Sequence, residues 1–293
     1  MKPDIFVFNF HRISNENSPA YPPITTKTFE KIIVYLKKHY TIISQKELLN
    51  NEIPLQNKPN CIITFDDAYY DFQENAVPIL IKHKCPATLH VVTETASTGK
   101  MFWTQRLNKI VEQYYIEKKS IYYNNTLIKR PETEKDVERT ALNIYLQLLN
   151  NKNQDSILDI LEKQLDNPIN QTRMLRWNEI EKLSNNLISI GSHTHTHCNL
   201  ATKDENEIYK ELKTSYDLIK KHTGNEPASI AYPNGQYNDT INNIAKEIGY
   251  HILYTCDCKK NVKSPNSIYH RYNLYNKQWW KNWIKLTCWR IHS

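Results

Sequence analysis

Glycine is scarce in this sequence, which has only 5 glycines in 293 residues. Because glycine is favoured where the backbone adopts left-handed dihedrals or approaches another group closely, each glycine is expected to mark such a position. The hydrophobic fraction of 40% and the charged fraction of 24% are those of an ordinary soluble globular protein. The length suits one large α/β barrel or two modest domains.

Long hydrophobic runs are also absent. No stretch of about 18 apolar residues is present, which excludes a membrane-spanning helix from the expected elements. The N-terminal segment MKPDIFVFNFHRIS has no sustained apolar core and carries Asn, His and Arg early, so no signal peptide is predicted. The six cysteines include no CxxC pair. We therefore expect a cytoplasmic protein with reduced thiols.

Blocks of positive charge are missing, although the net charge is +7. The lysines are scattered along the chain, so the sequence lacks the clustered basic footprint of a nucleic-acid-binding protein. A cationic surface of this kind favours anionic membranes or phosphate-bearing substrates instead.

Predicted strands and helices alternate at both ends of the chain, which indicates a parallel α/β architecture. Residues 99–176 interrupt this alternation with a polar, mostly helical segment, interpreted as an insertion; insertions on such scaffolds often shape the substrate cleft. The predicted strands are Ile5–Phe10, Thr41–Ile43, Cys61–Phe65, Ala87–Val92, Leu187–Ser192, Ser229–Ala231 and His251–Thr255. The predicted helices include Lys27–His39, Phe72–His83, Met101–Tyr115, Glu134–Leu149, Asp155–Leu165, Glu205–His222 and Thr240–Ile248.

Two adjacent carboxylates end a predicted buried strand in 61-CIITFDDAYYD-71. Parallel α/β enzymes keep their active sites at the C-terminal edge of the strands, where Asp66 and Asp67 are expected. Neighbouring side chains diverge, so one carboxylate can bind a cation while the other transfers protons. The alternative interpretation is a pair of helix-capping aspartates in a loop.

Three of the eleven histidines lie within five residues in 191-GSHTHTHCN-199, directly after a predicted strand. His193 and His197 are four residues apart, so on a helical or tight-turn backbone they point the same way, as metal ligands do. His195 lies between them and is expected to point elsewhere. Two imidazoles and one carboxylate, with positions left for water, are typical of a catalytic metal site.

The segments TFDDA and HTHTH together resemble the first two motifs of the polysaccharide deacetylases, the family with the NodB-homology domain (carbohydrate esterase family 4). The segment AYPNG, within 229-SIAYPNGQYN-238, is similar to the Pro-Gly motif of the same family. The resemblance covers roughly residues 1–100 and 174–273. It implies an α/β fold, a distorted (β/α)7 barrel with a mostly helical insertion, and a barrel domain over residues 1–275.

The resemblance also implies a reaction and roles for particular residues. The reaction is metal-dependent hydrolysis of an N- or O-acetyl group on a sugar. Asp67, His193 and His197 bind the metal and Asp66 is the general base, while a main-chain N–H near Tyr232 in the turn formed by Pro233, Asn234 and Gly235 faces the acyl oxygen. Zn²⁺ is the expected metal, and such a site also accepts Co²⁺ or Ni²⁺.

Two histidines remain open as the general acid. His270, in 268-IYHRYNL-274, stands where many family members have a C-terminal acid histidine. His11, in 8-FNFHRIS-14, resembles the opening of a subgroup that carries this histidine near the N-terminus. We favour His11 because it follows a predicted buried strand at the edge where the site is expected.

Two positions depart from the family pattern. Ala68 replaces the usual glycine after the two aspartates, so the backbone angles of this loop are expected to differ slightly. Ala231 stands where the family often has an arginine that tethers the base. Arg271 or Arg12 is expected to take over that contact.

The C-terminal tail, residues 276–293, is rich in Trp and Lys. On a helix its lysines and tryptophans form opposite faces, a pattern typical of a helix at a membrane interface. The alternative is a terminal helix that packs on the barrel through its tryptophans. Peripheral membrane contact and a lipid-linked glycan substrate are the corresponding hypotheses.

The sequence thus predicts a metal-dependent N-deacetylase of amino sugars in a polysaccharide, an oligosaccharide or a lipid-linked glycan precursor. A deformylase or a sugar O-acetyl esterase with the same site is the alternative enzyme. A non-catalytic glycan- or lipid-binding protein is the alternative of a different class.

Overall fold

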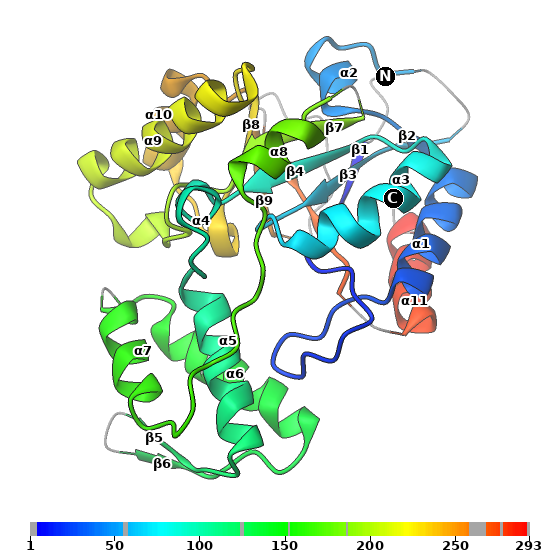
Figure 1. The fold of residues 1–293 in the computed structure, drawn as a ribbon. Helices are drawn as coiled ribbons and strands as arrows, with labels where there is room; N and C mark the ends of the chain where they lie inside the picture. The colour runs from blue at the N-terminus through cyan, green and yellow to red at the C-terminus, as the bar shows by residue number, and fades with distance from the viewer. Residues whose placement is uncertain are drawn as a thin grey trace.

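The computed structural model describes residues 5–54, 58–123, 126–151, 153–185, 187–257, 268–275 and 278–291. Within these ranges a parallel sheet curves into a barrel with helices around it (Figure 1). Its strands are β1 (Ile5–Phe10), β3 (Asn60–Phe65), β4 (Ala87–Val91), β7 (Ile188–Ser192), β8 (Ser229–Ala231), β9 (Ile252–Thr255), β10 (Ile268–His270) and β11 (Tyr272–Asn273). A short strand, β2 (Thr41–Ile42), pairs with the beginning of β3.

The last strand segment closes the barrel. β10 pairs with β9, and β11 pairs with β1 at the other end of the sheet order, so the chain from Ile268 to Asn273 bridges both edges. Only Arg271 separates the two pieces. Counting β10 and β11 as one interrupted strand, the described residues form a ring of seven strands, and the predicted distorted (β/α)7 barrel is confirmed.

The outer helices bury one apolar stripe each against the strands. Helix α1 (Thr26–His39) is capped by Thr25, whose hydroxyl accepts a hydrogen bond from the N–H of Thr28. The helix buries Phe29, Ile32, Ile33 and Leu36. These residues join the core between the strands and α3 (Val77–His83). The other helices around the sheet are α2 (Gln45–Leu49), η1 (Phe72–Ala76), α4 (Thr93–Thr98), α8 (Trp177–Leu183), α9 (Glu205–Thr223) and α10 (Asp239–Ile248).

Residues 99–176 form a helical layer with a core of its own. It contains α5 (Trp103–Ile116), α6 (Glu134–Leu148), α7 (Gln154–Glu162) and the antiparallel strands β5 (Ile121–Tyr123) and β6 (Thr126–Ile128). Buried side chains including Leu107, Ile110, Ile144 and Leu158 form this second core. In Figure 1 the segment lies beyond one end of the barrel, joined to it by α4 and the chain before α8.

The C-terminal helix α11 (Trp279–Ile291) packs against α1 (Figure 1). Leu286 is fully buried, Trp279 contacts Tyr35, and Trp289 contacts Tyr272 of the closing strand. The structure therefore shows a terminal helix packed on the barrel through its tryptophans, the second of the two alternatives for the tail. Among the described residues, no helix combines the length and the apolar character needed to cross a bilayer.

Candidate functional site

The candidate site lies where several parallel strands end. Asp66 and Asp67 follow β3 directly, and His193 follows β7 directly. Because the carboxyl ends of parallel strands meet at one edge, these residues converge although they are far apart in the sequence. All three side chains are buried.

Asp67, His193 and His197 form a compact cluster. The Nε2 atoms of His193 and His197 lie 3.4 Å and 3.5 Å from Oδ1 of Asp67. The three residues are the cluster of potential metal ligands found among the described residues. Distances of about 3.4 Å are those expected between ligand atoms that share one tetrahedral ion with bonds of about 2.1 Å.

The protonation of the cluster also fits a cation. Nδ1 of His193 lies 2.7 Å from the carbonyl oxygen of Ala231 and donates its hydrogen there, so Nε2 faces Asp67. Burial would lower the pKa of His193, but Asp66 and Asp67 raise it, so Nε2 would bind a cation in exchange for its proton. Burial, together with the neighbouring His193, lowers the pKa of His197 to about 3, so this ring is neutral as a metal ligand must be. Oδ1 of Asp67 is buried and accepts no hydrogen bond within the described residues. The residues present therefore suit a divalent metal.

The loop that carries the two histidines is not helical. Thr194 and His197 have φ angles of 66° and 60°, and these left-handed residues turn both rings toward Asp67. Glu211 of α9 holds the loop by accepting hydrogen bonds from the N–H groups of His195 and Thr196. Of the two backbones expected for this segment, helical or tight turn, the structure has the tight turn. His195 points away from the cluster, and its Nδ1 hydrogen-bonds to the hydroxyl of Thr93 of α4.

Asp66 lies in a different environment from Asp67. It accepts two hydrogen bonds of 2.8 Å from Arg271 and one of 3.0 Å from Asn9, and Nδ1 of His90 lies 3.2 Å away. Burial alone would raise the pKa of Asp66, but the charges of Arg271 and His193 and the approach of His90 hold it well below its usual value. Asp66 is therefore ionised and fixed in orientation.

Arg271, and not Arg12, contacts Asp66. The guanidinium of Arg271 enters from the gap between β10 and β11 and is fully buried. Arg12 instead forms an ion pair of 3.0 Å with Asp71. Of the two arginines expected to compensate for Ala231, Arg271 occupies the place beside the candidate base.

The two candidate acid histidines lie in different surroundings. His11 follows β1, and its Nε2 is 3.9 Å from Oδ2 of Asp66. Burial lowers the pKa of His11, while Asp67 and Asp66 oppose this effect. His270 is on β10, where Nδ1 is 3.0 Å from the hydroxyl of Thr255 and 3.8 Å from Asp257. The structure thus places His11 beside the candidate base, Asp66.

The turn at Pro233 offers a main-chain donor. The N–H groups of Tyr232, Gly235 and Gln236 donate to carbonyl oxygens, whereas within the described part of the chain Asn234 N–H has no acceptor. Asn234 is left-handed, with φ of 57°. Tyr232 uses both of its donors, because its hydroxyl donates to Asn242 of α10 and its N–H donates to the carbonyl oxygen of Tyr254, so the open main-chain donor of this turn is the N–H of Asn234.

The helical insertion reaches this site. Phe102 stacks on the ring of His197 with centroids 4.3 Å apart, and the indole N–H of Trp103 donates to the carbonyl of His197. Trp103 also stacks on Tyr145, whose hydroxyl donates to the side-chain oxygen of Asn234. The insertion thus supports both the histidine loop and the turn at Pro233.

Three residues beside Asp66 were not predicted as site residues: Asn9, Thr64 and His90. Each is a polar residue in a buried barrel strand, and each is fully buried. The Thr64 hydroxyl donates a hydrogen bond to the side-chain oxygen of Asn9. His90 lies between Asp66 and Ser229, with Nδ1 facing Asp66 and Nε2 hydrogen-bonded to the Ser229 hydroxyl. A polar residue near the carboxyl end of an apolar-rich strand is the signal that could have identified them.

The polysaccharide deacetylase sequence model matches residues 55–253, which span most of the chain and contain the aspartate pair, the histidine loop and the turn at Pro233. The chain belongs to the polysaccharide deacetylase family. Members of this family are hydrolases, and the resemblance of the motifs is thereby confirmed. A comparison with curated protein sequences gives no match.

Solved deacetylase structures share the fold over nearly the whole chain. The deacetylase PplD of Streptococcus pyogenes, solved with acetate, is 18% identical with a TM-score of 0.64, and the match covers 97% of this chain and 98% of that one. IcaB of Ammonifex degensii is 17% identical with a TM-score of 0.64 and coverage of 98% and 97%. A de-N-acetylase of Aggregatibacter actinomycetemcomitans is 17% identical with a TM-score of 0.57 and coverage of 95% and 98%.

Proposed function

We propose that this polysaccharide deacetylase is a metal-dependent enzyme that hydrolyses the acetamide of N-acetylated amino sugars in a glycan. The observation that carries the proposal is the buried cluster of Asp67, His193 and His197 beside a second, ionised carboxylate, Asp66. A binding protein has no need of a proton-accepting carboxylate beside a metal cluster. Zn²⁺ is the proposed ion, held by Asp67, His193 and His197.

Each residue has a distinct task in the proposed reaction. The ion, when bound, lowers the pKa of water and polarises the acyl oxygen. Asp66, oriented by Arg271, accepts the proton of the attacking water. The free N–H of Asn234 donates to the oxygen on which negative charge develops. His11 donates a proton to the departing amine, so that acetate and the free amino sugar leave.

The similar structures support acetyl as the acyl group that the enzyme removes. PplD was solved with acetate, which is the acid product of the proposed reaction, and the Aggregatibacter protein is described as a de-N-acetylase. At identities of 17% to 18% these structures show a shared fold, and the experiment below is designed to identify the sugar.

The test is acid release from matched substrates by the purified chain supplied with Zn²⁺. Acetate release from N-acetylated oligosaccharides is expected, with little formate from N-formyl analogues and little acetate from O-acetyl esters. Faster release from either alternative substrate would reassign the acyl specificity. Polyprenyl-phosphate-linked and free oligosaccharides, compared at equal concentration, distinguish a lipid-linked precursor from a soluble glycan.

A further inference from the structure

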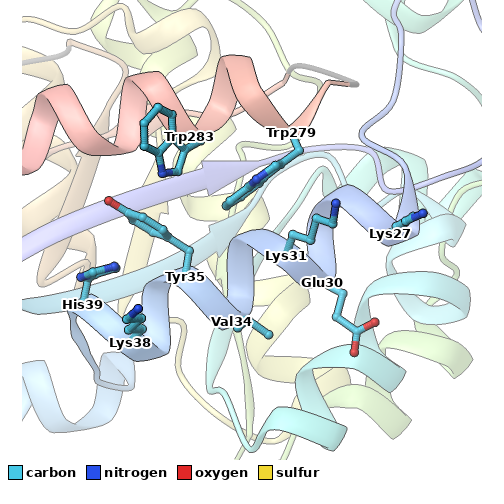
Figure 2. A pocket seen from close by; sticks show the side chains of 9 residues that line it. All are labelled: Lys27, Glu30, Lys31, Val34, Tyr35, Lys38, His39, Trp279 and Trp283. Carbon is cyan, nitrogen blue, oxygen red and sulfur yellow. The ribbon is translucent and has the colours of Figure 1, made fainter.

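An open groove runs between α1 and α11 on the outside of the barrel. It encloses about 650 Å³ and combines aromatic rings with cationic side chains. Figure 2 shows Trp279 and Trp283 of α11 above Tyr35 and His39 of α1, with Lys27 and Lys31 further along the same helix. The term α1–α11 groove is used below for the lining residues Lys27, Glu30, Lys31, Val34, Tyr35, Lys38, His39, Trp279 and Trp283.

The α1–α11 groove is rich in positive charge. Lys27, Lys31 and Lys38 are exposed, and no carboxylate among the described residues pairs with them. The one carboxylate in the lining, Glu30, is already bound to Lys82 and His83 of α3. The groove therefore has a net positive charge that an external anion can complement.

Helix α11 also carries a second apolar face beside the groove. Its inner face, with Trp279, Asn282, Leu286 and Trp289, packs on the barrel. On the outside, Trp280, Trp283 and Ile284 are 57%, 46% and 44% exposed, at helical spacing that puts them on one side. Lys281 lies over the ring of Trp280, which places a cation next to this face.

Exposed tryptophans flanked by unpaired lysines match the chemistry of a bilayer surface with anionic lipids. Indole rings favour the headgroup boundary, and lysines are attracted to the negative leaflet. We propose that the α1–α11 groove and the outer face of α11 dock the protein on an anionic phospholipid bilayer. The helix lies along the bilayer surface and the catalytic barrel remains outside it. This inference does not depend on the proposed reaction.

The test is sedimentation of the full chain with vesicles of phosphatidylcholine alone and of phosphatidylcholine and phosphatidylglycerol in equal parts. Binding to the anionic vesicles only is expected, weakened by added salt. Replacing Lys27, Lys31 and Lys38 with Gln should lower the affinity about fivefold for each lysine. The matched control replaces Lys210, Lys221 and Lys246, exposed on α9 and α10, and should bind as the wild type does.

The apolar face is tested separately. Trp280→Ala/Trp283→Ala should lose vesicle binding and the shift of tryptophan emission to shorter wavelength, whereas Leu142→Ala/Leu146→Ala, which removes exposed apolar side chains from α6, should keep both. Equal losses in the lysine variant and its control would overturn the proposal, as would equal binding to neutral vesicles or none to anionic ones. A dimer that Trp283→Ala dissociates would assign the groove to self-association instead.

Discussion

Arg271 and Asp66 face each other inside the barrel through two parallel hydrogen bonds, each 2.8 Å long. Arg271 comes from the break in the strand that closes the sheet, and Asp66 from the end of β3. Arg271 is fully buried and Asp66 almost so. The segment that closes the fold therefore also orients the proposed base.

The first prediction concerns the acidity of Asp66. Arg271→Lys keeps the positive charge but removes the two parallel hydrogen bonds to Asp66. These bonds counteract the effect of burial, so the pKa of Asp66 should rise without them. Since Asp66 acts as a base only when ionised, the acid limb of the kcat/KM profile should move to higher pH. The matched control is Arg106→Lys, which removes two hydrogen bonds from one guanidinium to Oε2 of Glu162 in the insertion and should leave the profile unmoved.

The same pair contributes to stability. Arg271→Met leaves a buried carboxylate without its counter-ion and should lower the free energy of unfolding by about 3–5 kcal/mol. The folded pKa of Asp66 is depressed, so its contribution is present above the unfolded pKa of about 3.9 and is lost as the pH falls through the folded value. Denaturant unfolding checks both points, and Asp66→Asn added to Arg271→Met should recover part of the loss.

Gly191 permits the contact between His90 and Asp66. A Cβ at position 191 would lie 2.5 Å from Cδ2 of His90 and 2.5 Å from Oγ of Ser229. Gly191→Ala should therefore displace His90 and misplace the base, lowering kcat about 10²-fold. Steady-state kinetics measure the effect. Gly224→Ala, at a helix end where a Cβ meets nothing within 4 Å, is the control expected to keep kcat.

The general acid is tested by two histidine variants. His11→Ala should lower kcat about 10²-fold or more, because it removes the proton donor near Asp66. His270→Ala removes contacts with Thr255 and Asp257 and should leave kcat nearly unchanged. The comparison uses one N-acetylated substrate at saturating concentration, and the reverse order of the two effects would assign the acid to His270.

Ala68 follows Asp67 in a left-handed conformation, with φ of 58°. The alanine thus adopts a conformation that glycine prefers. Because this costs an alanine about 1 kcal/mol, Ala68→Gly should raise the free energy of unfolding by about that amount. Thermal unfolding measures it, and an unchanged or lower melting temperature would show that Ala68 is not strained.

The site residues that follow the strands could be predicted from the sequence. The way in which the last strand closes the sheet could not. The aspartate pair and the histidine loop each follow an apolar strand, so their meeting at one edge follows from parallel pairing. The choice between Arg12 and Arg271 depended on which arginine enters the barrel, and this is decided by the break between β10 and β11. Tyr145 lies on an amphipathic helix of the insertion, and its contact with Asn234 depends on packing between distant segments.

The distribution of metal ions among two variants tests the central claim most directly. Metal content per chain is measured for Asp66→Asn and Asp67→Asn after loading with Zn²⁺, together with acetate release. Asp66→Asn should retain one ion and lose hydrolysis, because it keeps the ligands and lacks the base, whereas Asp67→Asn should lose both. Full activity in Asp66→Asn, or an unchanged metal content in Asp67→Asn, would contradict the division of tasks between the two neighbouring carboxylates.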